Sequence, residues 1–151
     1  MRFHLMCLLV MGLGFILVTG LRADIHRIKG SFLHLQKQVC QSSAINIHRY
    51  FDYSRIKEAW FAGADLPDEE CNDRIKAFRN AVQNWASLGQ GSPFCRFSIE
   101  NHQGSRLRLK FGYMYSYLDG DWAMDWRNGQ AVVVSLPRPP EPPPYGCGIP
   151  D

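Results

Sequence analysis

Residues 106–118 show the clearest alternation of hydrophobic and polar positions in the chain. The polar positions begin with three cations, while every second position from 107 onward is aliphatic or aromatic. A period of two predicts a long β-strand with one buried face and one charged face. We expect the second half of the chain to be arranged around this strand. Its apolar face consists of Leu107, Leu109, Phe111, Tyr113, Tyr115 and Tyr117.

A helix is predicted before this strand, over residues 72–88. Its apolar positions recur at helical spacing, and they are Ile75, Phe78, Val82 and Trp85. Asn72 is the expected N-cap, and the glycines and proline of residues 89–93 are typical of a helix end. The acidic residues ahead of Asn72 should stabilise the helix N-terminus.

Three further strands are predicted, at residues 94–100, 121–126 and 131–136. The last is β-branched almost throughout, which is typical of a strand covered on both faces. Asp119-Gly120 and Asn128-Gly129 favour type I′ hairpin turns, and turns this short join antiparallel strands. The sequence therefore predicts an α+β fold in which one main helix packs on an antiparallel β-meander.

The chain between the start of the mature protein and this helix is less regular. Residues 24–39 carry apolar side chains at helical spacing and predict a helix, although Gly30 interrupts the pattern. Residues 42–51 could form a short strand. Residues 53–61 fit a strand or a helix equally well.

Composition and an N-terminal targeting signal predict that the protein is a secreted globular domain. The chain has 151 residues, of which 46% are hydrophobic and 21% charged, as in one globular domain. Residues 1–23 have the charged start, apolar run and small residues of a secretory signal peptide, so residues 24–151 are the expected secreted domain. No further apolar run reaches membrane length. Without Arg2 and Arg22 the mature chain has 15 Lys and Arg against 14 Asp and Glu, so net charge alone does not favour nucleic-acid binding.

The cysteine count agrees with secretion. Cys7 belongs to the signal peptide, and four cysteines remain, which predicts two disulfides with three possible pairings. These four are Cys40, Cys71, Cys95 and Cys147. Neither a CxxC pair nor a Cys/His ligand spacing occurs, so we predict no zinc, no other metal and no cofactor.

A proline-rich arm, residues 137–147, follows the last predicted strand. Six prolines within residues 137–144 favour an extended polyproline II conformation. The arm either carries Cys147 to its disulfide partner or serves as a PxxP ligand for another protein.

Candidate functional residues gather across the predicted turn between residues 100 and 106. The phosphates of RNA could bind to the cations of this region, which are Arg96, Arg106, Arg108 and Lys110. A base, an acid and a cation are also what RNA cleavage by 2′-hydroxyl attack needs, and Glu100, His102 and Arg106 form that alternative catalytic set. Tyr113, Tyr115 and Tyr117 could offer faces for base stacking if they are exposed. In the plainer interpretation these charges are the solvated face of a strand, and the tyrosines of residues 113–117 belong to the core.

The chain resembles the secreted ribonuclease-like effectors of powdery mildews and related plant-pathogenic fungi, over residues 60–147. Residues 60–69, WFAGADLPDE, lead into the predicted helix as in that family, and residues 128–134, NGQAVVV, are similar to its last strands, with Cys147 beyond them. The resemblance implies a ribonuclease-like scaffold in a protein that is secreted and delivered into host cells. It also implies binding of host RNA or a host protein, with suppression of immunity as the result.

The sequence departs from the family pattern at several positions. Ala62 stands where the family has a cysteine, so the resemblance implies that Cys71 or Cys40 pairs with Cys147. The Tyr-x-His of active members is absent, and no histidine follows His102. The expected function is therefore non-catalytic binding, with an active ribonuclease and an interaction module that uses the proline-rich arm as alternatives.

Overall fold

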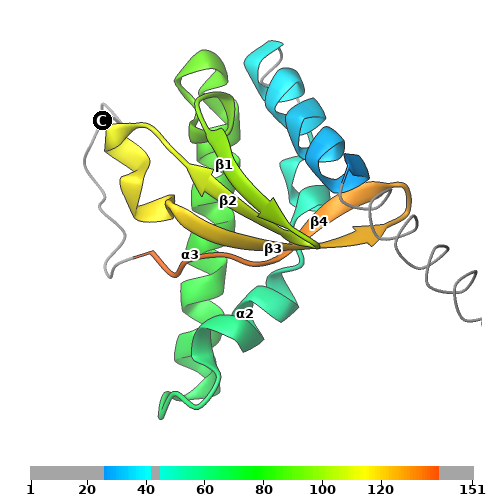
Figure 1. Ribbon diagram of the computed structural model, residues 1–151. Coiled ribbons are helices and arrows are strands. Elements are labelled where there is room, and N and C mark those ends of the chain that lie inside the picture. Colours follow the sequence, from blue (N-terminus) through cyan, green and yellow to red (C-terminus); the bar gives the residue numbers. More distant parts are fainter. Residues whose placement is uncertain (1–25, 42–44, 140–151) are drawn as a thin grey trace, which may run out of the picture.

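A four-stranded antiparallel sheet lies against helices in the computed structural model, which describes residues 26–41 and 45–139 (Figure 1). The strands follow one another in space as they do in sequence, so the predicted antiparallel meander and the α+β class are confirmed. The strands are β1 (Ser98–Gln103), β2 (Arg106–Lys110), β3 (Gly120–Arg127) and β4 (Gln130–Ser135).

The structure describes three α-helices, so the single main helix of the prediction is not confirmed. The first covers residues 26–41, and Gly30 is accommodated within it. Residues 53–61 are helical, as α2 (Tyr53–Phe61), and α3 (Asp68–Ser87) is the longest helix. Residues 42–51 do not form the predicted strand in their described part. Ile47–Tyr50 is instead the short 3₁₀ helix η1, and Phe51 makes an isolated bridge to Val133.

The helix α3 begins four residues earlier than predicted. Pro67 occupies the N-cap position and Asp68 is the first helical residue, so Asn72 is not the cap. The first turn contains three carboxylates, which the partial positive charge of a helix N-terminus favours, and the predicted placement of the acidic run at a helix start is confirmed. After the helix come two short 3₁₀ turns, η2 (Gly89–Gly91) and η3 (Pro93–Cys95), so β1 starts later than predicted.

The predicted long strand over residues 106–118 is wrong beyond Lys110. Leu107 and Leu109 are buried as the alternation requires, but the chain then leaves the sheet and forms η4 (Tyr113–Leu118), two short 3₁₀ turns joined at Tyr115. The backbone N–H of Phe111 donates to Asp119 Oδ1 at 2.7 Å, which closes this excursion at its base. Asp119-Gly120 is consequently not a hairpin turn.

The second predicted hairpin turn is confirmed. Asn128 and Gly129 connect β3 to β4 and have φ values of 51° and 79°. Positive φ at both central positions is the geometry of a type I′ turn, which matches the twist of the two strands.

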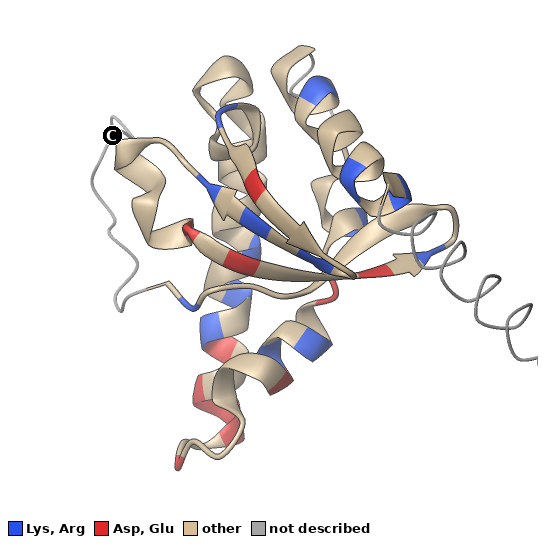
Figure 2. Ribbon diagram, in the orientation of Figure 1, with Lys and Arg blue, Asp and Glu red and all other residues tan. Residues whose placement is uncertain are grey.

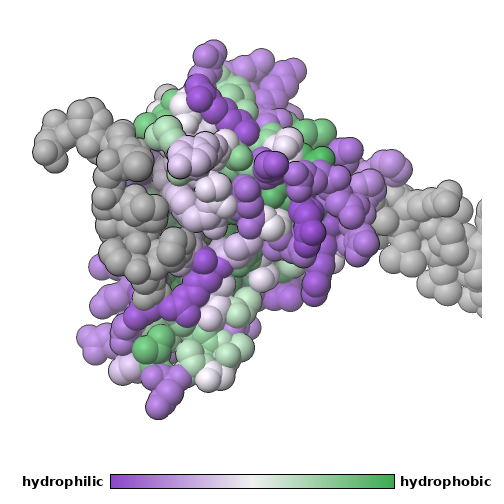
Figure 3. Space-filling model, turned by 60° about the vertical axis from the view of Figure 1, so that its left-hand side comes forward, coloured by the Kyte–Doolittle hydropathy of each residue, from purple (hydrophilic) through white to green (hydrophobic). Residues whose placement is uncertain are grey.

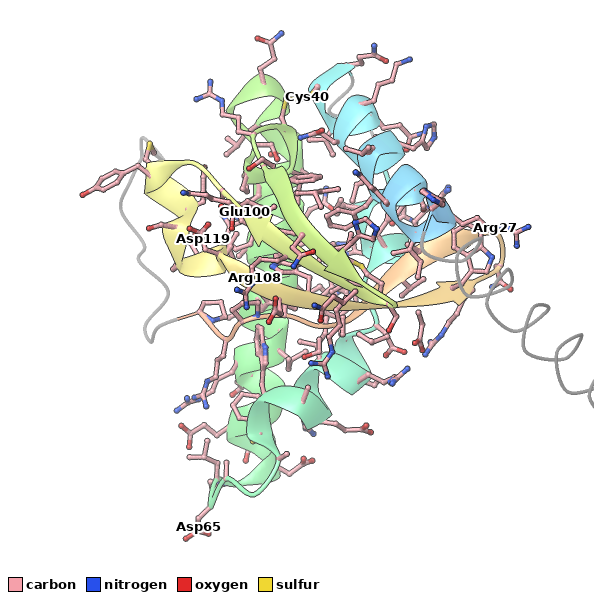
Figure 4. All side chains as sticks on the ribbon, viewed as in Figure 1. Arg27, Cys40, Asp65, Glu100, Arg108 and Asp119 are labelled. Carbon is pink, nitrogen blue, oxygen red and sulfur yellow. A yellow bond between two sulfur atoms is a disulfide. The ribbon has the colours of Figure 1, made fainter. Side chains whose placement is uncertain are left out.

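The first helix is fixed to the entry of β1 by a disulfide and a side-chain amide. Cys40 and Cys95 are bonded, with their Cα atoms 5.2 Å apart (Figure 4). Gln36 Nε2 also donates to Phe97 O at 2.9 Å. This bridge confirms one disulfide and excludes the Cys40–Cys147 pairing that the family resemblance allowed. Cys71 is buried and unpaired among the described residues, whereas the predicted signal peptide and Cys147 lie outside them.

Strand β4 is an edge strand that is nevertheless buried. The segment ahead of α2 covers part of the edge, since Asp52 N–H donates to Val133 O at 2.9 Å. The first helix contributes as well, because Ala131 N–H donates to Ser31 Oγ at 2.9 Å. Covering an exposed edge in this way prevents pairing with another chain.

No helix within the described ranges is long and apolar enough to cross a membrane.

Asp52 connects α2 to the sheet. Its side chain accepts from Arg55 N–H at 3.1 Å as the N-cap of α2 and accepts from Arg127 Nη1 of β3 at 2.6 Å. Burial acts to raise the pKa of Asp52, but these two hydrogen bonds and the nearby positive charges lower it below its ordinary value. The carboxylate therefore stabilises the fold when it is ionised.

We expect Asp52→Ala to lower the free energy of unfolding by about 1–2 kcal/mol at pH 7, because an N-cap and an ion pair are lost. The folded-state pKa is depressed, so this contribution is complete above the unfolded pKa and disappears as pH falls through the folded value. Urea denaturation from pH 7 to pH 3 should show wild type and variant converging in acid. Asp65→Ala, in the exposed loop before α3, is the control. A constant difference across this range would contradict the role given to Asp52.

Candidate binding surfaces

The predicted cations of β2 lie side by side on the exposed face of the sheet. Arg106, Arg108 and Lys110 alternate with buried leucines, so all three lie on the exposed face of the sheet. Arg108 is labelled on this face in Figure 4. Arg96 is not part of this row. It lies in the loop after η3, where its Nε donates to Gln90 O at 2.9 Å.

Carboxylates from the neighbouring strands neutralise much of this row, as the red and blue bands of β1, β2 and β3 show (Figure 2). Arg108 makes a bidentate pair with Asp121 of β3, with both N–O distances at 2.9 Å. The hydrogen bond from Arg108 lowers the pKa of Asp121. Lys110 Nζ lies 3.8 Å from Glu100 Oε1 of β1. Arg106 has no ion-pair partner among the described residues.

A small hollow of about 170 Å³ lies beside Arg106 on this face. It brings His102, Arg106 and Arg108 together, but Glu100 does not line it. The register of β1 shifts between Ile99 and Asn101, so Glu100 is an extra residue whose carboxylate faces Lys110. Of the alternative catalytic set, the hollow thus gathers His102 and Arg106 only. Its lining residues are Asn101, His102, Gln103, Arg106, Arg108 and Asp121.

A second surface contains the tyrosines that the plainer interpretation placed in the core and that the alternative interpretation offered as exposed faces for base stacking. Tyr113 is 96% exposed and Met114 is 54% exposed, both at the start of η4. Figure 3 turns this side of the molecule forward and shows pale and green atoms between purple neighbours. We call this the aromatic surface and define it by Tyr113, Met114, Tyr115, Tyr117 and Trp85.

Half-buried rings support the exposed residues of the aromatic surface from behind. The rings of Tyr115 and Tyr117 each lie 6.3 Å from that of Trp85 in α3, and Trp85 in turn lies 6.2 Å from the buried ring of Phe94. Burial raises the pKa of the Tyr115 phenol, while the nearby charge of Arg96 opposes this shift. Arg96 is therefore a neighbour of the aromatic surface rather than of the β2 cations.

The described residues contain no cluster of three or more His, Cys, Asp or Glu side chains suited to a metal ion.

Comparisons of the chain with protein-family models, with curated proteins and with solved structures give no significant match.

Proposed function

We propose that the protein is secreted and acts by binding, in the manner of the ribonuclease-like effectors that it resembles, and that its aromatic surface binds a host protein. On this proposal the scaffold is ribonuclease-like without catalysis, and occupation of the host protein suppresses immunity. The observation that carries the proposal is the exposure of Tyr113 and Met114 on a base of packed rings.

The residue types of the aromatic surface favour a protein partner. Tyrosine, tryptophan and arginine are the side chains that most often dominate the energy of a protein interface. Methionine adapts its shape to an apolar partner because its side chain is unbranched and polarisable. Leu88, which is 45% exposed three residues after Trp85, adds further apolar area at the same helix end.

The supporting rings also reduce the cost of binding. Tyr115, Tyr117 and Trp85 are already packed before a partner arrives, so little side-chain entropy remains to be lost there. Tyr113 and Met114 can then enter a pocket on the partner as anchors. By contrast, the exposed face of the sheet has paired charges and offers less to a polyanion.

We expect the double substitution Tyr113→Ala and Met114→Ala to weaken partner binding by about 30-fold or more, since anchor residues contribute 2 kcal/mol or more. Proteins captured from host tissue would be purified, and their affinities measured directly against both forms of the mature chain. Leu33→Ala is the matched control, because Leu33 is a similarly exposed hydrophobic residue on the first helix. Equal affinity of the double variant for every captured protein would exclude the aromatic surface.

RNA binding is a second candidate function, and the hollow beside Arg106 favours it. Arg106 makes no ion pair within the described residues and lines this hollow together with Asn101, His102 and Gln103. A guanidinium beside amide groups suits a phosphate group. Arg108 could join if a phosphate replaced Asp121 as its partner, because both residues of this pair are about half exposed.

We expect Asp121→Asn to raise RNA affinity roughly threefold or more by releasing Arg108, and Arg106→Ala to lower it, both more strongly at low salt. Mobility shifts at two salt concentrations measure this, with Lys37→Ala on the first helix as the control. If folded protein gives no mobility shift of RNA, RNA is excluded as a ligand. RNA cleavage that is lost in Glu100→Gln or His102→Ala would establish the enzyme alternative instead.

A further inference from the structure

The segment that covers the edge of β4 is bound to the sheet along one side. We call residues 47–52 the edge cover. Arg49 and Gln130 exchange two hydrogen bonds, from Arg49 Nε to Gln130 Oε1 at 2.9 Å and from Gln130 Nε2 to Arg49 O at 2.7 Å. Asp52 N–H donates to Val133 O at 2.9 Å, as described above. Polar contacts at both ends of the edge cover therefore hold it against β4.

On its other side the edge cover meets the helices at a histidine. His48 Nδ1 lies 2.8 Å from the hydroxyl oxygen of Tyr53 in α2, and the two rings are 5.7 Å apart. Arg79 of α3 places its guanidinium carbon 5.6 Å from the centre of the Tyr53 ring. His48 therefore lies at the junction of η1 with α2 and α3.

The surroundings of His48 favour its neutral form. Burial lowers the pKa of its imidazole below the ordinary value of 6.5, and the positive charge of Arg79 lowers it further. Burial also raises the pKa of the Tyr53 phenol, so this hydroxyl keeps its proton and donates to the unprotonated Nδ1 of His48. Protonation at Nδ1 would remove the acceptor of this hydrogen bond.

The charged groups on either side of His48 in the edge cover do not stabilise an imidazolium. Arg49 is itself a cation and is bound to Gln130. The Asp52 carboxylate accepts from Arg55 N–H and from Arg127, and its pKa lies below the ordinary value of 3.8, so it stays ionised in mild acid. Within the described residues His48 makes no ion pair with a carboxylate.

We propose that His48 is an acid-sensitive switch: when its imidazole is protonated, η1 separates from α2 and α3, and the edge cover releases the edge of β4. The released form binds the proton more strongly than the closed form, because water solvates its imidazole. Release therefore begins as pH falls below 6.5 and is complete once pH is below the pKa of the closed form. A freed edge can pair with another chain. This inference does not depend on the proposed function.

NMR titration of the His48 ring in the folded protein tests the electrostatic part of the proposal. We expect His48 to titrate below pH 6.5 in the wild type, and its midpoint to rise in Arg79→Gln because a nearby positive charge is removed. Lys76→Gln, which removes an exposed cation elsewhere on α3, is the matched control and should leave the midpoint unchanged. A wild-type midpoint at or above 6.5, or no change in Arg79→Gln, would overturn the switch.

Amide hydrogen exchange tests the release itself. We expect the protection factor of Asp52 N–H to be severalfold lower at pH 5 than at pH 7 in the wild type, while that of Val82 in the core of α3 stays unchanged. In His48→Gln the side-chain amide can still accept from Tyr53 but does not titrate, so the protection of Asp52 should not change with pH. Constant protection of Asp52 in the wild type, an equal loss in His48→Gln, or a parallel loss at Val82 would each contradict the proposal.

Discussion

Trp122 is the side chain on which the rest of the structure depends. It is fully buried at the middle of β3, and its ring lies within 6.4 Å of the rings of Phe32, Phe51 and Phe111. These three rings come from the first helix, from the segment before α2 and from the end of β2. Buried aromatic contacts of this kind add to the free energy of apolar burial and also fix geometry. One residue of the sheet therefore positions several otherwise separate parts of the chain.

Trp122 also fixes the position of the aromatic surface. Trp122 Nε1 donates to Leu118 O at 2.9 Å, and Leu118 is itself buried, so the end of η4 is held at the core. At the start of η4, Tyr113 projects into solvent. Because η4 is buried at its end and exposed at its start, its exposed side chains project from an ordered base. This arrangement suits binding, because a partner meets apolar side chains whose base is already ordered.

The sequence predicts the elements better than it predicts their ends and contacts. The regular spacing of apolar residues was enough to predict the first helix. Asn128-Gly129 was enough to predict a hairpin turn, because the φ values that the turn requires are a local property of these two residues. The long strand over residues 106–118 failed because a tertiary contact, from Phe111 N–H to the Asp119 side chain, ends the strand although the alternation continues. For the candidate sites, the alternation of apolar and polar residues correctly predicted that the cations of β2 are exposed. Their carboxylate partners could not be found, since they depend on strand register and on the bulge at Glu100.

The most direct test of this account measures the reactivity of each tyrosine in the folded protein. Brief treatment with tetranitromethane followed by peptide mass mapping would rank the rates of nitration. The account predicts that Tyr113 reacts first and that Tyr50, which is buried in the core, reacts last. Nitration of Tyr113 as slow as that of Tyr50 would contradict it, because residues 113–118 would then be packed as a strand and the proposed binding surface would not exist.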